Sequence, residues 1–189
     1  MKVIGVLALQ GSVIEHMSAL GKLDDVKAVE VKRPGELDYI DALILPGGES
    51  TTISKLLDIF GLTEPLKKRI KSGMPVWGTC AGMILLANDV IGGEVSLGLM
   101  DITVRRNAYG RQIDSFRTRA RIVQVSDEEI PLIFIRAPWI ERTGDNVKIL
   151  CKTDGHITAA IQDNMLVTSF HPELSEDISF HRFLRDMIK

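Results

Sequence analysis

The cysteine at position 80 lies in a pattern that is typical of a nucleophile held on a sharp turn. Residues 78–82, Gly-Thr-Cys-Ala-Gly, directly follow an apolar run at residues 74–77, which predicts a strand, a tight turn and a helix. Glycines two positions away on each side leave room for the turn, and the positive end of the following helix favours a thiolate. The sequence therefore predicts that Cys80 is a nucleophile at the top of a sheet.

A nucleophilic cysteine usually works with an imidazole, and His171 is the best placed of the four histidines. It follows the apolar run at residues 165–170, and strand ends on one edge of a parallel sheet cluster together. We therefore expect His171 to face Cys80. Pro172 stiffens the turn, and Glu173 can orient the imidazole and stabilise its cation. An ordinary loop is the alternative interpretation of this segment.

Two segments could supply the backbone N–H donors of an oxyanion hole. Ala81 follows the predicted nucleophile at the start of the helix. Gly47 and Gly48 follow the apolar run at residues 42–45 and have no side chain, so a substrate could approach their backbone closely. The alternative is a tight strand-to-helix turn that merely uses glycine.

Alternating strand and helix patterns in the first half must position these residues, and they favour a doubly wound, mainly parallel sheet. The predicted strands are residues 2–9, 26–32, 42–45 and 74–77. The predicted helices are a segment from Ser12 to about residue 23, residues 51–60, residues 65–72 and the segment after Cys80. Ser12 and Glu15 have the spacing of a capping box at the start of the first helix.

The second half changes character and is predicted to be mostly strands from about residue 102 to residue 160. Asp154-Gly155 between two apolar runs is a strong hairpin signal. Residues 165–170 form the predicted last strand, and apolar residues at helical spacing after residue 177 predict a closing helix. We expect an α/β fold with a strand-rich second half and one domain over residues 1–189.

Composition limits the kind of protein. A formal charge of −2 gives no electrostatic footprint for nucleic acid or an anionic membrane, and the apolar runs are too short to span a bilayer. No secretory signal pattern is present, and two cysteines, Cys80 and Cys151, suit a reducing cytoplasm. No cluster of Cys and His has the spacing of a zinc site.

Three segments together resemble the signatures of class I glutamine amidotransferases. They are residues 45–50 (Leu-Pro-Gly-Gly-Glu-Ser), residues 78–82 and residues 169–173 (Ser-Phe-His-Pro-Glu). Within that class, the chain is similar to the glutaminase subunits of pyridoxal 5′-phosphate synthases. The further matches are Leu9-Gln10-Gly11 with Glu15-His16, residues 46–52, Arg106-Asn107 with Gly110-Arg111-Gln112 and Asp114-Ser115-Phe116, and residues 134–138.

The resemblance implies a fold, a reaction and a partner. The fold would be the three-layer, flavodoxin-like one of this class, with helices on both sides of the sheet. Cys80 would attack the side-chain amide of L-glutamine, His171 would move the protons, Glu173 would orient His171, and water would hydrolyse the glutamyl thioester. Ammonia would pass to a barrel-shaped synthase subunit, and the glutaminase itself would need no cofactor or metal, since pyridoxal phosphate is the product of the complex.

The resemblance also assigns the contacts to glutamine. They fall on Gly48, Glu49 and Ser50, on Arg106, and on Ile135 and Arg136, beside the oxyanion donors at Gly47 and Ala81. The segment of Gln10 would touch the partner and help to form the oxyanion hole. Arg136 ends an apolar run, so we expect a partner for its charge, and the sequence leaves open whether this is glutamine or a structural carboxylate.

Three residues outside this group are given structural roles. We expect His16 on the first helix as a structural or interface residue, His181 on the surface of the closing helix and Cys151 buried in a strand. Three other functions remain as alternatives. They are a glutaminase that serves a different synthase, a free-standing cysteine hydrolase of similar fold, and a binding module with an inactive cysteine.

Overall fold

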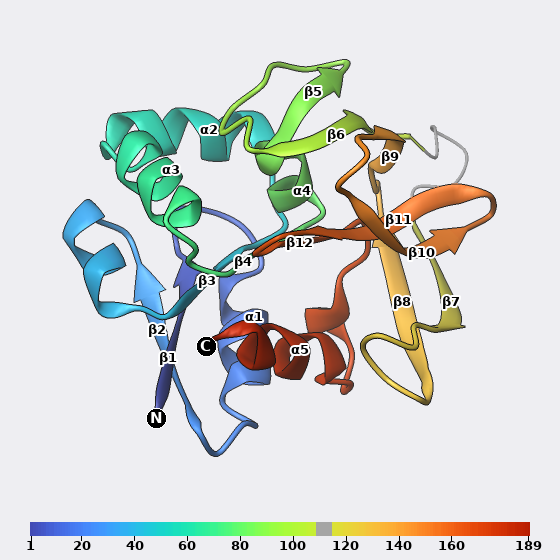
Figure 1. The fold of residues 1–189 in the computed structure, drawn as a ribbon, viewed down its shortest axis with the longest axis horizontal. Helices are drawn as coiled ribbons and strands as arrows, with labels where there is room; N and C mark the ends of the chain where they lie inside the picture. Colours follow the sequence, from blue (N-terminus) through green and yellow to red (C-terminus); the bar gives the residue numbers. More distant parts are fainter. Residues whose placement is uncertain (109–114) are drawn as a thin grey trace.

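The computed structural model describes residues 1–108 and 115–189, and a ten-stranded sheet runs through its middle (Figure 1). The strands lie in the order β2-β1-β3-β4-β12-β11-β9-β6-β5, and β10 pairs with β11. Their bounds are β1 Lys2–Leu7, β2 Val26–Val31, β3 Ala42–Leu45, β4 Val76–Thr79, β5 Ala87–Ile91, β6 Met100–Arg105, β9 Trp139–Thr143, β10 Lys148–Thr153, β11 His156–Gln162 and β12 Met165–Thr168. Strands β2 to β12 in this order are parallel, as are β5 and β6, whereas β11 and β9 join these two groups by antiparallel pairs.

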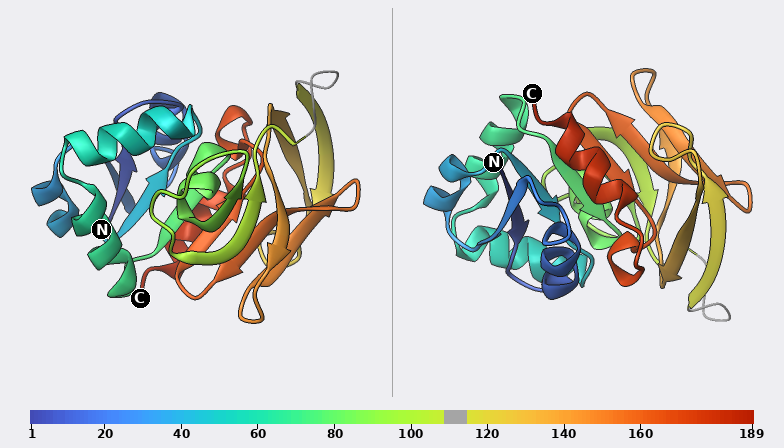
Figure 2. Two further views of the ribbon diagram at one scale, coloured as in Figure 1. Left: turned by 90° about the horizontal axis from the view of Figure 1, so that it is seen from above. Right: turned by 90° about the horizontal axis from the view of Figure 1, so that it is seen from below.

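Helices cover both faces of the sheet (Figures 1 and 2). On one face lie α2 (Ser50–Ile59), α3 (Thr63–Lys71) and α4 (Ala81–Leu86), and on the other lie α1 (Val13–Leu20) and α5 (Ser179–Met187). Two short 3-10 helices, η1 (Pro34–Tyr39) and η2 (Pro172–Leu174), complete the helical elements of the described chain. The predicted α/β fold, with a mostly parallel central sheet between helices, is confirmed.

The inner strands β3, β4 and β12 are buried along their whole length, as their apolar sequences require for strands covered on both faces. One apolar cluster joins the sheet to α2, α3 and α4. A second cluster joins it to α1, α5 and strand β8. The sheet is therefore the middle layer between two separate cores.

The strand-rich second half builds part of the sheet and a separate ribbon. Strands β7 (Ser115–Arg121) and β8 (Glu129–Ile135) form a two-stranded antiparallel sheet that packs beside α5 against the second core. The predicted hairpin at Asp154-Gly155 connects β10 to β11, and both turn residues have positive φ angles, 51° and 82°. A hairpin turn with two such residues matches the twist of the strands it joins.

Two local predictions on the helices are wrong. The Ser12 side chain makes no capping bond to α1 and instead donates a hydrogen bond to Glu173. His181 is on α5 as predicted but is completely buried, because it lies on the side of the helix that faces Trp77. Cys151 is buried in β10, as expected.

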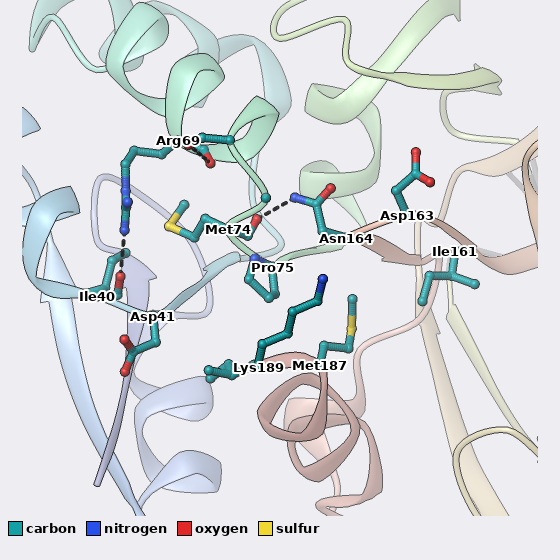
Figure 3. A pocket seen from close by; sticks show the side chains of 13 residues that line it. Ile40, Asp41, Arg69, Met74, Pro75, Ile161, Asp163, Asn164, Met187 and Lys189 are labelled. Carbon is teal, nitrogen blue, oxygen red and sulfur yellow. Dashed lines mark hydrogen bonds between the residues drawn. The ribbon is translucent and has the colours of Figure 1, made fainter.

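A cavity of about 730 Å³ opens at the amino ends of β3, β4 and β12 (Figure 3). Its polar side chains bind neighbouring loops: Arg69 donates to the carbonyl of Ile40 at 2.9 Å, and Asn164 donates to that of Met74 at 2.7 Å. The predicted site residues follow the carboxyl ends of the strands, at the opposite edge of the sheet. No helix of the described residues is long and apolar enough to cross a membrane.

Candidate active site

Cys80 lies between β4 and α4 with an unusual backbone conformation. Its φ and ψ angles are 48° and −99°, a combination that side chains rarely adopt, and its N–H donates to the carbonyl of Thr168 at 2.8 Å. Such a backbone persists only where its surroundings hold it, and it stores on the order of 1–3 kcal/mol. The turn aims Cys80 into a cavity at the carboxyl ends of the inner strands.

The two glycines beside this turn are required by close packing. A Cβ atom at Gly78 would lie 2.5 Å from the carbonyl group of Gly82, and one at Gly82 would overlap the carbonyl oxygen of Leu45. The helix can therefore start directly against β3 and β4 only with glycine at both positions.

His171 and Glu173 follow β12, the strand beside β4, and form a close pair. The distance between His171 Nδ1 and Glu173 Oε1 is 2.8 Å, and the two residues are 8% and 6% exposed. Ser12 Oγ donates to the same carboxylate oxygen at 2.7 Å. The backbone N–H of His171 donates to the carbonyl of Ile133 at 2.8 Å, so strand β8 holds the turn in place.

The electrostatics of this pair favour charged forms. Burial lowers the pKa of His171, but hydrogen bonds to Cys80 and Glu173 and the attraction of both groups outweigh it and raise the pKa to about 10. Burial raises the pKa of Glu173, but the imidazoles of His16 and His171 and the Ser12 hydroxyl lower it to about 2. At neutral pH the site therefore holds an imidazolium between a carboxylate and the sulfur.

The turn after β3 lies directly against the imidazole. A Cβ atom at Gly47 would overlap the ring of His171, so only glycine fits here. The carbonyl of Gly47 accepts a hydrogen bond of 3.0 Å from the N–H of Ser12. Because the peptide bond is trans, the N–H of Gly48 points away from Ser12.

Gln10 holds the other side of this turn. Its Oε1 accepts a hydrogen bond of 2.8 Å from the N–H of Glu49, and a Cβ atom at Gly48 would lie 2.5 Å from the same oxygen. The segment after β1 and the segment after β3 are thus tied together at the point where the strand order reverses, which is where open parallel sheets bind ligands.

Glu49 and Arg106 form a polar wall of the cavity. The Glu49 carboxylate is the N-cap of α2 and accepts hydrogen bonds from the backbone N–H groups of Thr51 and Thr52. Its partial burial raises its pKa, but the bonds from Thr52 and Thr51 outweigh this and lower the pKa to about 2. Arg106 Nη2 lies 3.1 Å from Glu49 Oε1, so these two charges are paired.

One cavity of about 460 Å³ collects nearly all of the predicted site residues. Its lining includes Gln10, Gly47, Gly48, Glu49, Ser50, Cys80, Ala81, Arg106, Ile135, Arg136 and His171. Glu173 is the exception, because it lies behind His171. Among the described residues, no group of three or more His, Cys, Asp or Glu side chains is arranged to hold a metal ion.

For Arg136 the sequence leaves open whether glutamine or a structural carboxylate balances the charge. Arg136 follows β8 with a positive φ of 42°, and its side chain is exposed, so solvent offsets its charge. It makes no hydrogen bond or ion pair with another described residue, whereas Arg106 is paired with Glu49. The guanidinium of Arg136 is thus open to a ligand in the cavity.

Sequence reasoning missed several residues of the site. Ser12, Asn107, Pro138 and Leu174 line the same cavity. The position of Ser12 directly after the first strand could have suggested a place at this edge of the sheet, but its side-chain partner lies 161 residues further along the chain. The motif residues Gly110, Arg111, Gln112 and Asp114 lie outside the described residues.

Comparison with known proteins agrees with this geometry. A model of the SNO glutamine amidotransferase family matches residues 6–189. The chain is 54% identical over 189 residues to the pyridoxal 5′-phosphate synthase subunit PdxT of Ruminiclostridium cellulolyticum, covering 100% of both chains. It is 60% identical over 178 residues to the PdxT subunit of Clostridium beijerinckii, covering 94% of this chain and 93% of that one. A solved glutamine amidotransferase superposes with a TM-score of 0.92 at 39% identity, covering 98% of each chain. The chain belongs to the SNO glutamine amidotransferase family.

Proposed function

We propose that this protein is the glutaminase subunit of a pyridoxal 5′-phosphate synthase. It hydrolyses the side-chain amide of L-glutamine to glutamate and ammonia and delivers the ammonia to the synthase subunit. The observation that carries this proposal is the cavity in which Cys80, the His171–Glu173 pair and the glycine turn meet in a chain whose full-length relatives are named PdxT.

The charged His171 defines how the reaction begins. Because the pKa of His171 is raised to about 10, the ring already carries a proton at neutral pH, and this imidazolium stabilises the thiolate form of Cys80 that attacks the substrate. The thiolate adds to the amide carbon of glutamine. His171 gives its proton to the leaving nitrogen, ammonia departs, and a glutamyl thioester remains. His171 then takes a proton from water as the water attacks the thioester. The second intermediate expels the thiolate, the carboxyl group of glutamate loses its proton to solvent, and the pair of Cys80 and His171 is restored.

The oxyanion formed in each addition needs donors near Cys80. The N–H of Ala81 at the start of α4 is one donor, and the glycine turn at Gly47 and Gly48 is the second source. The bond between Ser12 and the Gly47 carbonyl sets the direction of that peptide. A flip of this peptide would reverse the directions of the Gly47 carbonyl and the Gly48 N–H, and glycine permits such a flip at little cost.

The cavity also has groups suited to the ends of an amino acid substrate. Arg136 and Arg106 are positive groups for the carboxylate of glutamine. Because the Glu49 side chain is held by Thr51, Thr52 and Arg106, residues 48–50 contact the substrate mainly through their backbone.

The partner is the synthase subunit, docked over the mouth of the cavity. Ile135 and Leu174 line the cavity and are 38% and 39% exposed, and Ile14, two residues after the lining residue Ser12, is 78% exposed. Apolar side chains around an active-site mouth favour a protein cover, and a cover keeps ammonia from escaping into water. A reducing cytoplasm, where a free thiolate persists, is the compartment that this chemistry requires.

The test is a glutaminase assay of the wild type and of Cys80→Ala, with and without the synthase subunit. We expect glutamate release that rises steeply with the partner and is lost in Cys80→Ala. Cys151→Ala is the matched control, because Cys151 is buried in β10 away from the cavity, and it should keep its turnover. Intact glutamine in the presence of wild type and partner would contradict the proposal, and turnover by Cys80→Ala would show a different nucleophile.

A further inference from the structure

Two histidines lie behind Glu173, and no step of the reaction described above uses them. His16 on α1 and His181 on α5 are both 0% exposed. His16 Nε2 lies 3.5 Å from Glu173 Oε2, and His16 Nδ1 lies 3.0 Å from His181 Nε2. The buried groups thus continue in an unbroken row from His171 through Glu173 and His16 to His181.

The two oxygens of Glu173 have different surroundings. Oε1 accepts hydrogen bonds from His171 and Ser12 at 2.8 Å and 2.7 Å. Oε2 is buried and has no hydrogen-bond partner among the described residues. The nitrogen that faces it is His16 Nε2, which is also 3.3 Å from the hydroxyl of Thr79. A buried carboxylate oxygen without a donor is unfavourable. A proton on His16 Nε2 therefore stabilises the folded state more than a proton on Nδ1, because only Nε2 faces this oxygen.

The row of groups decides which tautomer His16 adopts. Full burial lowers the pKa of His16 and outweighs the attraction of Glu173, so the ring is neutral and has one N–H. With the proton on Nε2, that N–H points at Glu173, and Nδ1 accepts from His181 Nε2–H. The unpartnered buried atom is then His181 Nδ1, an acceptor nitrogen. The opposite tautomer would also leave His181 Nδ1 unpartnered, now as a buried N–H, and it would turn the lone pair of His16 Nε2 towards the Glu173 carboxylate, which repels it.

We propose that His16 is a positioning residue for the reaction at Cys80, donating its Nε2–H to Oε2 of Glu173, and that His181 holds it in this tautomer. The inference rests on the proposed glutaminase function. His16 does not line the cavity and so does not bind glutamine. It fixes the plane of the Glu173 carboxylate, which in turn fixes the ring of His171.

The experiment compares His16→Leu with His16→Gln in the complex with the synthase subunit. A glutamine side chain carries its amide nitrogen the same number of bonds from the backbone as His Nε2, so it restores the donor, whereas leucine removes it. We expect kcat for glutamine to fall about tenfold in His16→Leu with KM within about twofold, and to recover most of its value in His16→Gln. His156→Leu, a histidine in β11 that does not line the cavity, is the matched control and should keep its kcat.

A second measurement does not need glutamine or the partner. We expect alkylation of Cys80 by iodoacetamide to slow in His16→Leu and to recover in His16→Gln. If the wild type fails to hydrolyse glutamine, the proposed function is wrong, and the alkylation rates still decide the role of His16. Equal losses in both variants, or a fall in the free energy of unfolding with unchanged kcat, would overturn the proposal. The ¹⁵N spectrum of histidine-labelled wild type provides a check without any variant, and an Nδ1–H tautomer at His16 would also overturn it.

Discussion

At the scale of single residues, the shape of the cysteine turn matters as much as the chemistry of its side chain. Cys80 is held at φ 48° and ψ −99° by a backbone bond to Thr168 and by the absence of side chains at Gly78 and Gly82. The sequence pattern predicts this turn because a helix can follow a strand so closely only where glycine removes the overlap. The role of each glycine is therefore open to a direct test.

Gly82→Ala should destabilise the protein and reduce the alkylation of Cys80. The added Cβ would overlap the carbonyl oxygen of Leu45, which forces α4 away from β3 and costs about 2 kcal/mol or more. Gly35→Ala is the matched control, because no heavy atom lies within 4 Å of its Cβ position. Urea unfolding measures both variants, and equal free energies of unfolding would contradict the packing argument.

Glu173→Gln should lower kcat on the order of 10²-fold or more while KM for glutamine changes little, because the side chain acts through His171. Removal of the carboxylate takes away one cause of the raised pKa of His171, so the imidazolium should be lost at a lower pH than about 10. The pH dependence of Cys80 alkylation measures this shift. Glu176→Gln is the control, since the side chain of Glu176 is 97% exposed. An unshifted pH profile in Glu173→Gln would contradict the proposed action of Glu173 on His171.

At the scale of elements, local patterns predicted which segments are helices and strands but not which long-range partners their polar side chains bind. Ser12 and Glu15 have capping-box spacing, yet the Ser12 hydroxyl binds Glu173, because this carboxylate lies at the same edge of the sheet. The helical spacing in α5 predicted the helix, but not that His181 would turn inward against Trp77. The sequence pattern predicts strands between β9 and β12, but the order in which these strands join the sheet follows from contacts that no local pattern contains.

The packing of α1 against α5 through His16 and His181 predicts a pH dependence of stability. Burial and the proximity of His16 lower the pKa of His181 to about 3, below the ordinary value of 6.5. Below about pH 6.5 His181 is therefore protonated in the unfolded chain but stays neutral in the folded chain. Stability is unaffected well above pH 6.5 and falls as the pH decreases through 6.5. Between pH 7 and pH 5 the lowered pKa of His181 reduces the free energy of unfolding by about 2 kcal/mol.

His181→Phe should remove this share of the acid sensitivity. Phenylalanine can keep the contact with Trp77 and has no proton to take up. Between pH 7 and pH 5 the free energy of unfolding of the variant should therefore fall by about 2 kcal/mol less than that of the wild type. Urea unfolding at pH 7, 6 and 5 measures both slopes. Parallel slopes would mean that His181 titrates alike in the folded and unfolded chains.

At the scale of the whole molecule, one sheet connects the two halves that the sequence distinguishes. Strand β12 from the second half pairs with β4 from the first half along four residues, and the Trp77 ring N–H donates to the hydroxyl of Thr168 at 3.2 Å. The cavity of the proposed active site takes the proposed nucleophile, Cys80, from one half and the proposed base, His171, from the other. We therefore infer that the chain is one domain and that neither half can hold the site alone.

A single domain should unfold in one transition, and the two tryptophans can report on the halves separately. Trp77 is buried in β4 and Trp139 lies in β9, so Trp139→Phe leaves a probe of the first half and Trp77→Phe leaves a probe of the second. In each variant we expect the fluorescence midpoint in urea to coincide with the midpoint of far-ultraviolet circular dichroism. Trp77→Phe will be less stable because Trp77 fills the second core, so the comparison is made within each variant. A fluorescence transition displaced from the dichroism transition in either variant would show that the strand-rich half unfolds on its own, since the pairing of β4 with β12 would then not couple the two halves.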